Sequence, residues 1–501
     1  MLHVHQLVRR KKFKMGSNNT DALIAHGLAL HRKNKIDQAE KIYEQVLCLD
    51  PENPDALHLK GVALIAKNEN KAAVEFITRA IILRPDEHAF YSNLAAALQK
   101  LGLAAKAQFY VEKALSLNMV NAESFVILGQ SLVTQGNLDQ ALDKFNVALK
   151  IQPSNPAAFR GVVDVLSKRE RYPELEKVLS ARLQDGDRSD FILMKLATTH
   201  FNMKQAGEAI KLLDQCKHQA GHDWHVNKLK AHLALQQVES ALPHGHELLV
   251  IKDKLASLLM EQDEIRAVHS RWPTNFRQFD GTSPHRNIVC FSLWGNDPKY
   301  TYTAVVNAKM VPKIYRGWTA RFYVDDTVPL EIRNALVQYG AQVILVENDG
   351  RNYLKLFWRF LASDDQGVDF FISRDADAIV NIREKAAVDE WLASGKPFHM
   401  MRDHPEHAEL IMAGMWGGIS GLLPNLTRQA VEYYETHETK WRWVDQDFLR
   451  DRVWPIIKNH VISHDTYYQF GSDARKFPAG SELPEGDHVG GYAPVTWKVK
   501  D

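Results

Sequence analysis

Two aspartates separated by one residue follow an apolar segment in the C-terminal half of the chain. The sequence "VDFFISRDADAIV", residues 368–380, places Asp375 and Asp377 directly after that segment. On an extended backbone, residues two apart point the same way, so both carboxylates can face one side. Carboxylate oxygens suit a hard divalent cation such as Mg²⁺ or Mn²⁺, which commonly bridges the oxygens of a diphosphate. The pair therefore indicates a cation site, although a solvated turn after a strand can use the same residues.

Apolar and amphipathic segments alternate around the aspartate pair. This alternation predicts a mostly parallel sheet with helices on both faces. In such a sheet, ligands bind at the carboxyl ends of the strands, which is where the pair would lie. The strands are expected at 287–295, 319–326, 341–347 and 368–373, and the helices between them at 297–315, 330–339 and 353–362.

The N-terminal half repeats small and large residues every 34 positions. Small residues at these steps allow two helices to approach closely, and a large residue fills the groove between them. The pattern resembles the tetratricopeptide repeat (TPR), whose hairpins stack into a solenoid with a concave surface. The small residues are Gly27, Gly61, Ala95 and Gly129, then Ala39, Ala73, Ala107 and Ala141, and the large ones are Tyr43, Ile77, Val111 and Phe145.

These patterns predict the organisation of the chain. A basic tail is expected at 1–19, and a TPR solenoid at 20–262 with four clear repeats at 20–155 and degenerate ones to 262. A linker rich in proline, glycine and small polar residues is expected at 263–285, ahead of the sheet domain at 286–501.

The composition excludes several classes of protein. The chain has 501 residues, a net charge of +1 and three cysteines far apart in sequence. The near-zero charge argues against bulk binding of nucleic acid, and the cysteines make no disulfide framework, which suits the cytoplasm. No apolar run is long enough for a transmembrane segment, and the basic start lacks the apolar stretch of a secretory signal.

Three segments of the C-terminal half resemble nucleotide-sugar glycosyltransferases with the GT-A fold. "FISRDADAIV" resembles their donor-metal motif. "VDQDFLRD", residues 444–451, resembles the Asp-Gln-Asp-x-Leu motif of the retaining glycogenin-like and lipooligosaccharide-galactosyltransferase-like enzymes. "DHVGG", residues 487–491, resembles their late His-x-x-Gly motif. The resemblance implies an α + α/β protein, in which an N-terminal TPR α-solenoid precedes a GT-A-like, Rossmann-like and mostly parallel domain.

The same resemblance implies the metal ligands. Asp375 and Asp377 would bind Mn²⁺ or Mg²⁺, and His488 of the late motif would be the third ligand. His464 competes with His488 for that role. Haloacid-dehalogenase-like phosphatases use a similar aspartate pair, but after their first strand and with threonine or valine where this chain has Ile379.

Catalytic roles are expected in the second motif. Asp445 and Gln446 would orient the donor sugar and stabilise positive charge at its anomeric carbon. In an inverting enzyme, Asp445 or Asp447 would instead be the general base for the acceptor hydroxyl. Asp445 could also be no more than a helix N-cap.

Donor-binding residues are expected around the strand ends. Trp416 and Gly417 would form a sugar-binding floor, although a core tryptophan at a tight turn fits equally. Three histidines at 399, 404 and 407 leave a zinc site open as an alternative. The candidate donor-binding residues are Trp294, Asn296, Lys299, Tyr300, Arg374, Asp403, Trp416 and Gly417.

The expected function is a glycosyltransferase that uses a nucleotide-diphosphate sugar, taken to be a UDP-sugar. The acceptor is expected to be a protein or peptide read by the concave TPR face, such as a bacterial surface or flagellar protein. Two alternatives are a transferase acting on a glycan, with the repeats serving assembly, and a non-catalytic TPR adaptor. The repeats also make a homo-oligomer conceivable.

Overall fold

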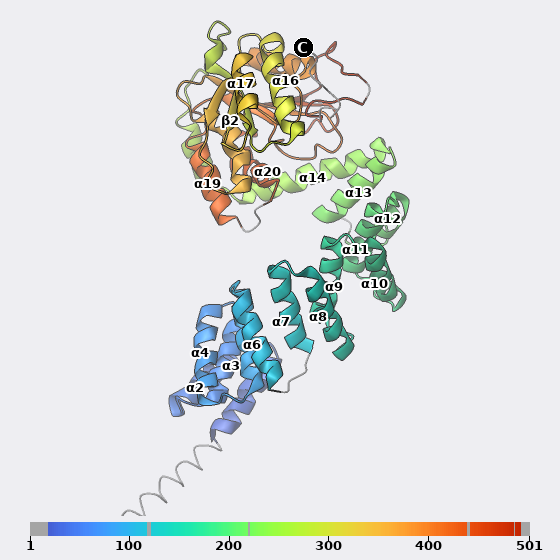
Figure 1. Ribbon diagram of the computed structural model, residues 1–501, viewed down its shortest axis with the longest axis vertical. Helices are drawn as coiled ribbons and strands as arrows, with labels where there is room; N and C mark the ends of the chain where they lie inside the picture. The colour runs from blue at the N-terminus through green and yellow to red at the C-terminus, as the bar shows by residue number, and fades with distance from the viewer. Residues whose placement is uncertain (1–18, 118–121, 219–220, 438–440, 485, 492–501) are drawn as a thin grey trace, which may run out of the picture. The chain divides into compact units, whose positions relative to one another are not determined.

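The computed structural model describes residues 19–117, 122–218, 221–437, 441–484 and 486–491. These residues form two compact units that divide between Lys204 and Gln205 (Figure 1). The first unit is helical, and the second has helices followed by a sheet. The expected basic tail, residues 1–19, lies outside the described residues except for its last position, where a helix over 19–32 already runs.

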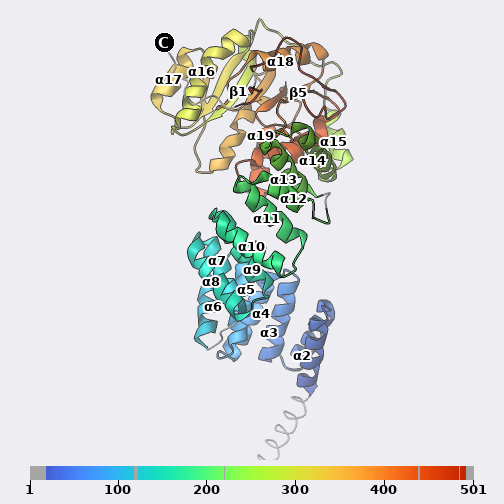
Figure 2. The same ribbon diagram turned by 90° about the vertical axis from the view of Figure 1, so that its right-hand side faces the viewer.

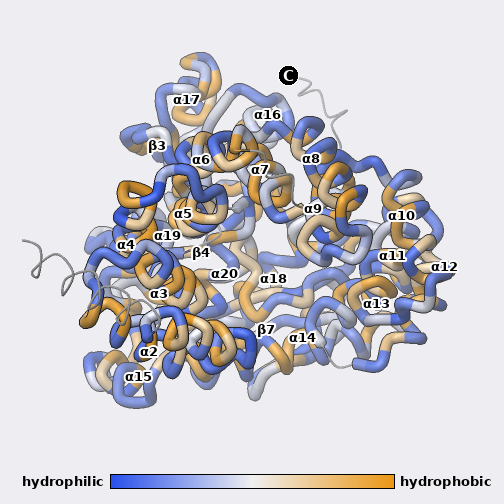
Figure 3. The backbone as a smooth tube through the Cα atoms, turned by 90° about the horizontal axis from the view of Figure 1, so that it is seen from below, coloured by the Kyte–Doolittle hydropathy of each residue, from blue (hydrophilic) through white to orange (hydrophobic). Residues whose placement is uncertain are grey.

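The first unit is a row of helical hairpins. Consecutive helices lie side by side along the chain (Figure 2), and orange and blue alternate along α2 in Figure 3, as expected of an amphipathic helix. Their bounds are α2 (Ile36–Leu49), α3 (Pro54–Ala66), α4 (Asn70–Leu83), α5 (His88–Lys100), α6 (Ala104–Ser116), α7 (Ala122–Thr134), α8 (Leu138–Ile151), α9 (Pro156–Lys168), α10 (Tyr172–Gln184) and α11 (Asp190–Asn202).

The small residues of the 34-residue pattern lie against its large residues. A methyl group at Gly129 would come within 2.6 Å of the ring of Phe145, and one at Gly61 would overlap the side chain of Ile77. Phe145 and Ile77 are both buried. The expected close packing of small against large residues within each hairpin is therefore confirmed.

A residue with positive φ ends the first helix of each hairpin at a constant interval. The interval is 34 residues and continues past residue 155, where the sequence pattern degenerates. Gln236 also has a positive φ in the same kind of turn, but it lies 32 residues after Lys204, the last member of the regular series. The six residues of the regular series are Asn34, Asn68, Gly102, Gly136, Glu170 and Lys204.

The second unit contains an eight-stranded, mostly parallel sheet. Its strand order is β3-β2-β1-β4-β6-β5-β7-β8, and β6 runs antiparallel to both neighbours. The first four strands coincide with those expected from sequence. The bounds are β1 (Asn287–Leu293), β2 (Thr319–Val324), β3 (Gln342–Leu345), β4 (Phe370–Arg374), β5 (Phe398–Arg402), β6 (Met415–Ile419), β7 (Val461–Asp465) and β8 (Ala474–Arg475).

Helices cover both faces of the sheet. On one face Tyr315, which follows α16, donates a hydrogen bond of 2.9 Å to Glu384 of α18. On the other face Phe360 of η2 packs on Trp416 of β6. The helix expected at 353–362 is this η2, a 3₁₀ helix. The bounds are α16 (Pro298–Ile314), α17 (Leu330–Gln338), η2 (Asn352–Ser363), α18 (Ile382–Ser394), α19 (Leu426–Thr436), α20 (Val444–Phe448), η3 (Leu449–Val453) and α21 (Trp454–Ile457).

Helices that precede the sheet in sequence belong to the same compact unit. Lys252 of α14 is almost fully buried and donates a 2.7 Å hydrogen bond to the carbonyl of Ala408. Its neighbour Asp253 accepts a hydrogen bond of 2.7 Å from the indole of Trp454. The helices concerned are α12 (Ala206–Leu213), α13 (His222–Ala234), α14 (Val238–Leu258) and α15 (Gln262–His269).

The division into units therefore differs from the expected domain boundaries at 262 and 286. Part of the segment expected as a linker, 263–285, is helix α15, and Trp272 after it donates a hydrogen bond of 2.8 Å to the carbonyl of Leu422. In the described parts of the chain, none of the helices is both long and apolar enough to span a bilayer.

Candidate functional site

The strand order creates a switch point between β1 and β4. From β1 the chain proceeds to β2 and β3 on one side, and β4 then lies on the other side of β1. Crevices at the carboxyl ends of strands at such a point are where open α/β sheets bind ligands. Trp294 follows β1 and Asp375 follows β4, so two of the expected site segments lie at this switch point.

Arg359 of η2 bridges two of the expected site carboxylates. One terminal nitrogen of its guanidinium donates to Asp375 and the other to Asp445. Burial acts to lower the pKa of Arg359, but the two carboxylates outweigh it and raise that pKa. The structure thus brings together residues 70 positions apart in sequence through a buried cation.

Lys299 of α16 reaches the second aspartate of the pair. Its ammonium lies 2.8 Å from Oδ2 of Asp377 and 5.1 Å from the ring centre of Tyr300. Burial, together with the charge of Asp375, raises the pKa of Asp377, and Lys299 partly opposes this. Three of the expected residues, Asp375, Asp377 and Lys299, therefore lie in one group.

The Asp-Gln-Asp segment contributes one carboxylate, that of Asp445, to the group. The helix α20 begins at Val444 with Trp443 at its N-cap position, so Asp445 is not the N-cap. Asp445 is 2% exposed, and burial raises its pKa against the effect of Arg359. The Oε1 atom of Gln446 is buried and has no hydrogen-bond partner among the described residues.

Asp447 is held away from that group by other partners. Its carboxylate accepts hydrogen bonds of 2.8 Å from Arg450 and 2.7 Å from the indole of Trp441. These contacts join Asp447 to Arg450, which follows α20, and to Trp441, which precedes it. Of the three expected catalytic residues, Asp445 is therefore the one that the structure joins to the group.

The glycine that approaches the aspartates is Gly414, not Gly417. A methyl group at Gly414 would overlap the carboxylate of Asp375, whereas one at Gly417 would overlap the carbonyl of Phe371 in β4. Trp416 is fully buried, and its ring packs on Phe371. Trp416 and Gly417 thus belong to the core of the sheet, and the expected sugar-binding floor is not formed by them.

Arg374 lies on the opposite side of the sheet from Asp375. Adjacent residues of a strand face opposite sides. The guanidinium of Arg374 lies 3.3 Å from the carboxylate of Glu384 and donates to the hydroxyl of Tyr315. The expectation that Arg374 is a donor-binding residue beside the aspartate pair is therefore wrong.

His464 does not face the aspartates either. It lies in β7, which two strands separate from β4. Its Nδ1 is 2.9 Å from Nε2 of His399 and its Nε2 is 3.3 Å from Glu390 of α18. Both ring nitrogens are thus engaged on the α18 face, which excludes His464 as the third ligand in this arrangement.

His488 lies in a cluster with His404 and His407. The ring centres are 4.5 Å and 5.2 Å from that of His488, whose Nδ1 donates to the carbonyl of Val489. Burial lowers the pKa values of His404 and His407. Asp403 precedes this cluster and accepts a hydrogen bond of 3.0 Å from the amide of Val489.

Asp403 is an anchor for the C-terminal segment. Both of its oxygens accept hydrogen bonds from Arg383, at 2.8 Å and 2.9 Å, and Thr466 also donates to it. The bidentate pair accounts for Arg383, which follows the aspartate motif in sequence. No contact among the described residues joins Asp403 to the aspartate group.

The loop after β1 presents side chains of differing exposure. The Trp294 ring is half-buried, with its centre 6.3 Å from that of Trp358. Asn296 is exposed, and Tyr300 is 39% exposed. Trp294 thus packs on one side, while Asn296 and Tyr300 are accessible to a ligand at the switch point.

The buried cations on η2 were not predicted from the sequence, although one pattern points to them. Lys355 and Arg359 are four residues apart in an otherwise apolar segment, and both are buried. Lys355 lies 2.8 Å from Asp325 at the end of β2. Two basic residues four positions apart in a buried segment require carboxylate partners, which Asp325, Asp375 and Asp445 supply.

Several carboxylates lie close together at the site, but among the described residues they do not form a complete set of metal ligands. Within residues that the structure describes, no group of three or more histidine, cysteine, aspartate or glutamate side chains is arranged to hold a metal ion. The zinc alternative at the histidines of 399–407 has no support in this arrangement.

Comparisons with known proteins concern the N-terminal part of the chain. Two family models described as tetratricopeptide repeat match residues 30–98 and 93–156. The N-terminal region carries tetratricopeptide repeats. The helical hairpins of the first unit are called the TPR solenoid below. None of the curated proteins compared with the chain matches it.

Several solved structures are similar to part of the chain. A tetratricopeptide repeat protein from Parabacteroides merdae is 19% identical, with 46% of this chain and 91% of that chain covered and a TM-score of 0.36. PilF of Pseudomonas aeruginosa is 19% identical over 40% of this chain and 91% of its own, with a TM-score of 0.36. A TPR protein of Thermus thermophilus is 17% identical over 36% of this chain and 99% of its own, with a TM-score of 0.32.

Proposed function

We propose that the chain is a glycosyltransferase with a GT-A-like catalytic domain, which transfers a sugar from a nucleotide diphosphate to a protein acceptor. The observation that carries the proposal is the group at the carboxyl end of β4. There Arg359 joins Asp375 to Asp445, and Lys299 joins Asp377. Three carboxylates and two cations at a switch point suit a ligand that is both anionic and hydroxylated.

The aspartate pair fits a cation shared with a diphosphate. Mg²⁺ is usually bound by one or two carboxylates together with substrate phosphates, so a full protein cage is not required. The side chain of Asp375 is 45% exposed and offers an oxygen to solvent beside Asp377. Asp375 and Asp377 would hold Mn²⁺ or Mg²⁺, and the bound cation would supply positive charge to the departing diphosphate.

Side chains near the aspartate pair would bind the diphosphate, the nucleoside and the sugar of the donor. Lys299 carries positive charge at the place where a diphosphate would meet Asp377, and ammonium groups bind phosphate oxygens well. Asn296 in the loop after β1 and Tyr300 in α16 are both exposed and would contact the nucleoside. The unpaired Oε1 of Gln446 is an acceptor for a sugar hydroxyl, because a buried carbonyl without a partner is costly.

Asp445 is suited to the reacting end of the sugar. Its carboxylate is buried, and Arg359 favours its ionised form against the effect of burial. A negative charge fixed in a water-poor site stabilises the positive charge that develops at an anomeric carbon. The TPR solenoid supports a protein acceptor, because stacked repeats form surfaces that bind other proteins.

Donor turnover tests the proposal. Purified protein, Mn²⁺ and a panel of nucleotide sugars should release nucleoside diphosphate with at least one donor, and Asp377→Ala should reduce that release by about a hundredfold or more. Asp389→Ala is the matched control, since Asp389 is a 57% exposed aspartate of α18 paired with Lys385. It should leave turnover unchanged.

Metal binding gives a readout that does not depend on turnover. Titration of Mn²⁺ into the protein with nucleoside diphosphate should release heat for the wild type and for Asp389→Ala, but not for Asp377→Ala. If the wild type is silent with every donor and binds no nucleotide, the non-catalytic adaptor is the better account.

A further inference from the structure

A buried asparagine of α16 contacts the backbone that follows the aspartate pair. The side chain of Asn307 is fully buried. Its nitrogen donates a hydrogen bond of 2.8 Å to the carbonyl of Ala378, and its oxygen accepts one of 3.0 Å from the amide of Val380. A primary amide both donates and accepts, so this side chain takes the place of a neighbouring strand for these two backbone groups. Asn307 therefore holds residues 378–380, which come directly after Asp377.

The residue that Asn307 contacts also closes the turn that carries the pair. The amide of Ala378 donates a hydrogen bond of 3.4 Å to the carbonyl of Asp375, so residues 375–378 form one turn with Asp377 inside it. Ala378 and Val380 are both buried, and buried backbone groups without partners are costly. Because the turn and the contact with Asn307 share Ala378, a shift of this contact would change the direction in which Asp377 points.

The helix α16 contacts the same segment at a second point. Lys299, eight residues before Asn307, lies 2.8 Å from Asp377. Residues four and eight positions apart share one face of a helix, so α16 presents both side chains to the turn. At its far end the segment is fixed by Asn381, the N-cap of α18, which accepts a hydrogen bond of 3.0 Å from the amide of Glu384. Between these two points, Asn307 is bonded to the backbone itself.

We propose that Asn307 is a positioning residue of the candidate site. It holds the turn of residues 375–378 so that Asp375 and Asp377 face one divalent cation. Asn307 acts through the backbone of Ala378 and Val380 and does not touch the cation. Groups that orient metal ligands in this way change metal affinity or activity by about 10–100-fold when they are replaced. The inference rests on the proposed function, because it assigns a further residue to the cation site of the transferase.

A second buried asparagine provides a matched control at the other end of the sheet. Asn287 is 1% exposed and donates hydrogen bonds of 2.8 Å and 2.9 Å to the carbonyls of Asp280 and Gly317. It is the first residue of β1, whereas the candidate site lies at the carboxyl ends of the strands. Each of the two asparagines bonds two backbone groups, so their loss should lower the melting temperature by similar amounts.

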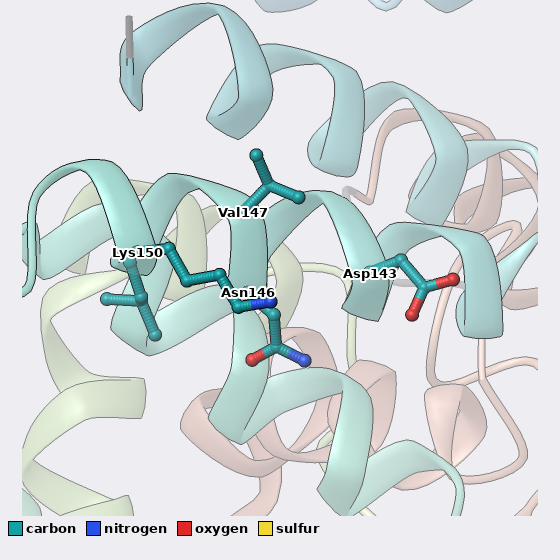
Figure 4. Close-up of a pocket in the computed structure, with 5 residues that line it drawn as sticks. Asp143, Asn146, Val147 and Lys150 are labelled. Carbon is teal, nitrogen blue, oxygen red and sulfur yellow. The ribbon is translucent and has the colours of Figure 1, made fainter.

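An exposed asparagine provides the control for the change of residue type alone. Figure 4 shows Asn146 of α8 in a hollow on the TPR solenoid, together with Asp143 and Lys150. Because Asn146 is exposed, Asn146→Leu should change neither the melting temperature nor cation binding.

Hydrogen exchange of the full-length protein without metal tests whether Asn307 holds the turn. Leucine at this position has a similar volume but neither donates nor accepts a hydrogen bond. In Asn307→Leu, peptides that cover residues 375–381 should exchange at least about tenfold faster than in the wild type. Asn307→Ser is the milder variant, because its hydroxyl can still bond one backbone group, and it should show a smaller increase. Asn287→Leu and Asn146→Leu should leave the exchange of these peptides unchanged.

Binding of Mn²⁺ measures the consequence for the cation site. Calorimetric titration of Mn²⁺ into the full-length protein with uridine or guanosine diphosphate gives the dissociation constant. It should be about 10–100-fold higher for Asn307→Leu than for the wild type, with Asn307→Ser between the two. Asn287→Leu should have a lowered melting temperature but an unchanged dissociation constant. A purely structural role of Asn307 would give the two leucine variants the same result.

Two results would overturn the inference. One is unchanged exchange of residues 375–381 in both variants of Asn307, and the other is equal weakening of Mn²⁺ binding in Asn307→Leu and Asn287→Leu. If Asn307→Leu does not fold, the same two measurements on Asn307→Ser decide. If the wild type binds no Mn²⁺ with either nucleotide, the proposed function fails, whereas faster exchange of the turn in the Asn307 variants alone would still support Asn307 as the residue that holds it.

Discussion

At the scale of single residues, Arg359 is the centre of the candidate site. It is buried and lies between the carboxylates of Asp375 and Asp445. Those carboxylates would otherwise repel each other in a medium of low polarity. The guanidinium therefore does two things, since it neutralises the pair and fixes the position of each carboxylate relative to the other.

Replacing Arg359 by methionine should remove that coupling. Losing one partner of a buried ion pair costs about 3–5 kcal/mol, and the pKa of Asp445, already raised by burial, should rise further. Donor turnover should fall by about a hundredfold or more. The acid limb of the pH–rate profile should move to higher pH, because Asp445 would be protonated sooner as the pH falls.

A surface arginine provides the comparison for this variant. Arg428 of α19 is 79% exposed and pairs with Glu432 on the same helix, so Arg428→Met should change neither turnover nor the pH profile. An unshifted acid limb in Arg359→Met would mean that the guanidinium does not control the ionisation of Asp445.

Sequence reasoning located the aspartate pair but not the residues that hold it. The end of an apolar strand predicted Asp375 and Asp377 correctly as a strand-end group. The same reasoning was wrong for Arg374. Adjacent residues of β4 alternate between the two faces of the sheet, and the partner of Arg374, Glu384, lies on α18. Arg359 and Asp445 are 86 residues apart, and a contact of that kind has no local signature.

At the scale of elements, the turn inside each hairpin follows a stricter rule than the sequence shows. Left-handed backbone at six positions 34 residues apart includes Glu170 and Lys204, where no glycine or asparagine marks the turn. The sequence pattern therefore weakens after residue 155 while the backbone pattern persists. Repeat packing tolerates the strain of a non-glycine residue there, because both helices are already held by their buried faces.

Gly136→Ala tests that rule by isolating backbone strain. Gly136 has φ of +80°, and a methyl group there would meet no atom within 4 Å, so the cost comes from the left-handed conformation alone. The free energy of unfolding should fall by about 1 kcal/mol. Urea denaturation followed by circular dichroism measures this change.

Gly207→Ala is the opposite case and serves as its control. Gly207 lies within α12, also with no atom near the added methyl group but without positive φ. Alanine favours a helix over glycine by about 1 kcal/mol, so stability should rise or stay constant. Equal losses in the two variants would contradict the strain argument.

A buried histidine links two neighbouring hairpins. Nε2 of His58 in α3 is 2.7 Å from the side-chain nitrogen of Asn93 in α5. Burial lowers the pKa of His58 to about 4, with Asp55 acting weakly in the other direction. The side-chain amide of Asn93 is thus engaged within the solenoid.

This histidine should make the solenoid sensitive to acid. The unfolded chain protonates His58 near pH 6.5, whereas the folded chain keeps it neutral down to about pH 4. The stabilising effect of the lowered pKa is fully present above about pH 6.5 and is lost as the pH falls toward 4, by up to about 3 kcal/mol. Urea unfolding of the wild type and His58→Gln at several pH values should show a smaller pH dependence in the variant.

At the scale of the whole molecule, the two kinds of architecture were predicted correctly from the sequence. The boundary between them was expected at residue 262, whereas the compact units divide between Lys204 and Gln205. Repeat spacing identified the helical hairpins, and strand–helix alternation identified the sheet and its first four strands. Amphipathic helices look alike whether they stack on a repeat or on a sheet. The contacts of Lys252 and Asp253 of α14 with the sheet domain therefore had no distinct sequence signal.

The position of that division can be tested with two fragments. Residues 205–501 should unfold in one cooperative transition, because they form one compact unit. Residues 286–501 lack α14 and Trp272, which leaves the indole of Trp454 and the carbonyls of Ala408 and Leu422 without their partners. Each lost partner at a buried polar group costs about 1–3 kcal/mol, so the shorter fragment should melt at a lower temperature and bind a hydrophobic dye.

Point variants in the full chain separate the effect of α14 from that of truncation. Lys252→Met removes the hydrogen bond to Ala408 and the ion pair with Glu409 but keeps most of the side-chain volume. It should lower the melting temperature of the second unit without changing that of the first. Lys254→Met, two residues along the same helix and exposed, should change neither transition. If the shorter fragment proves as stable as the longer one, α14 belongs with the TPR solenoid and the division expected at residue 262 is the right one.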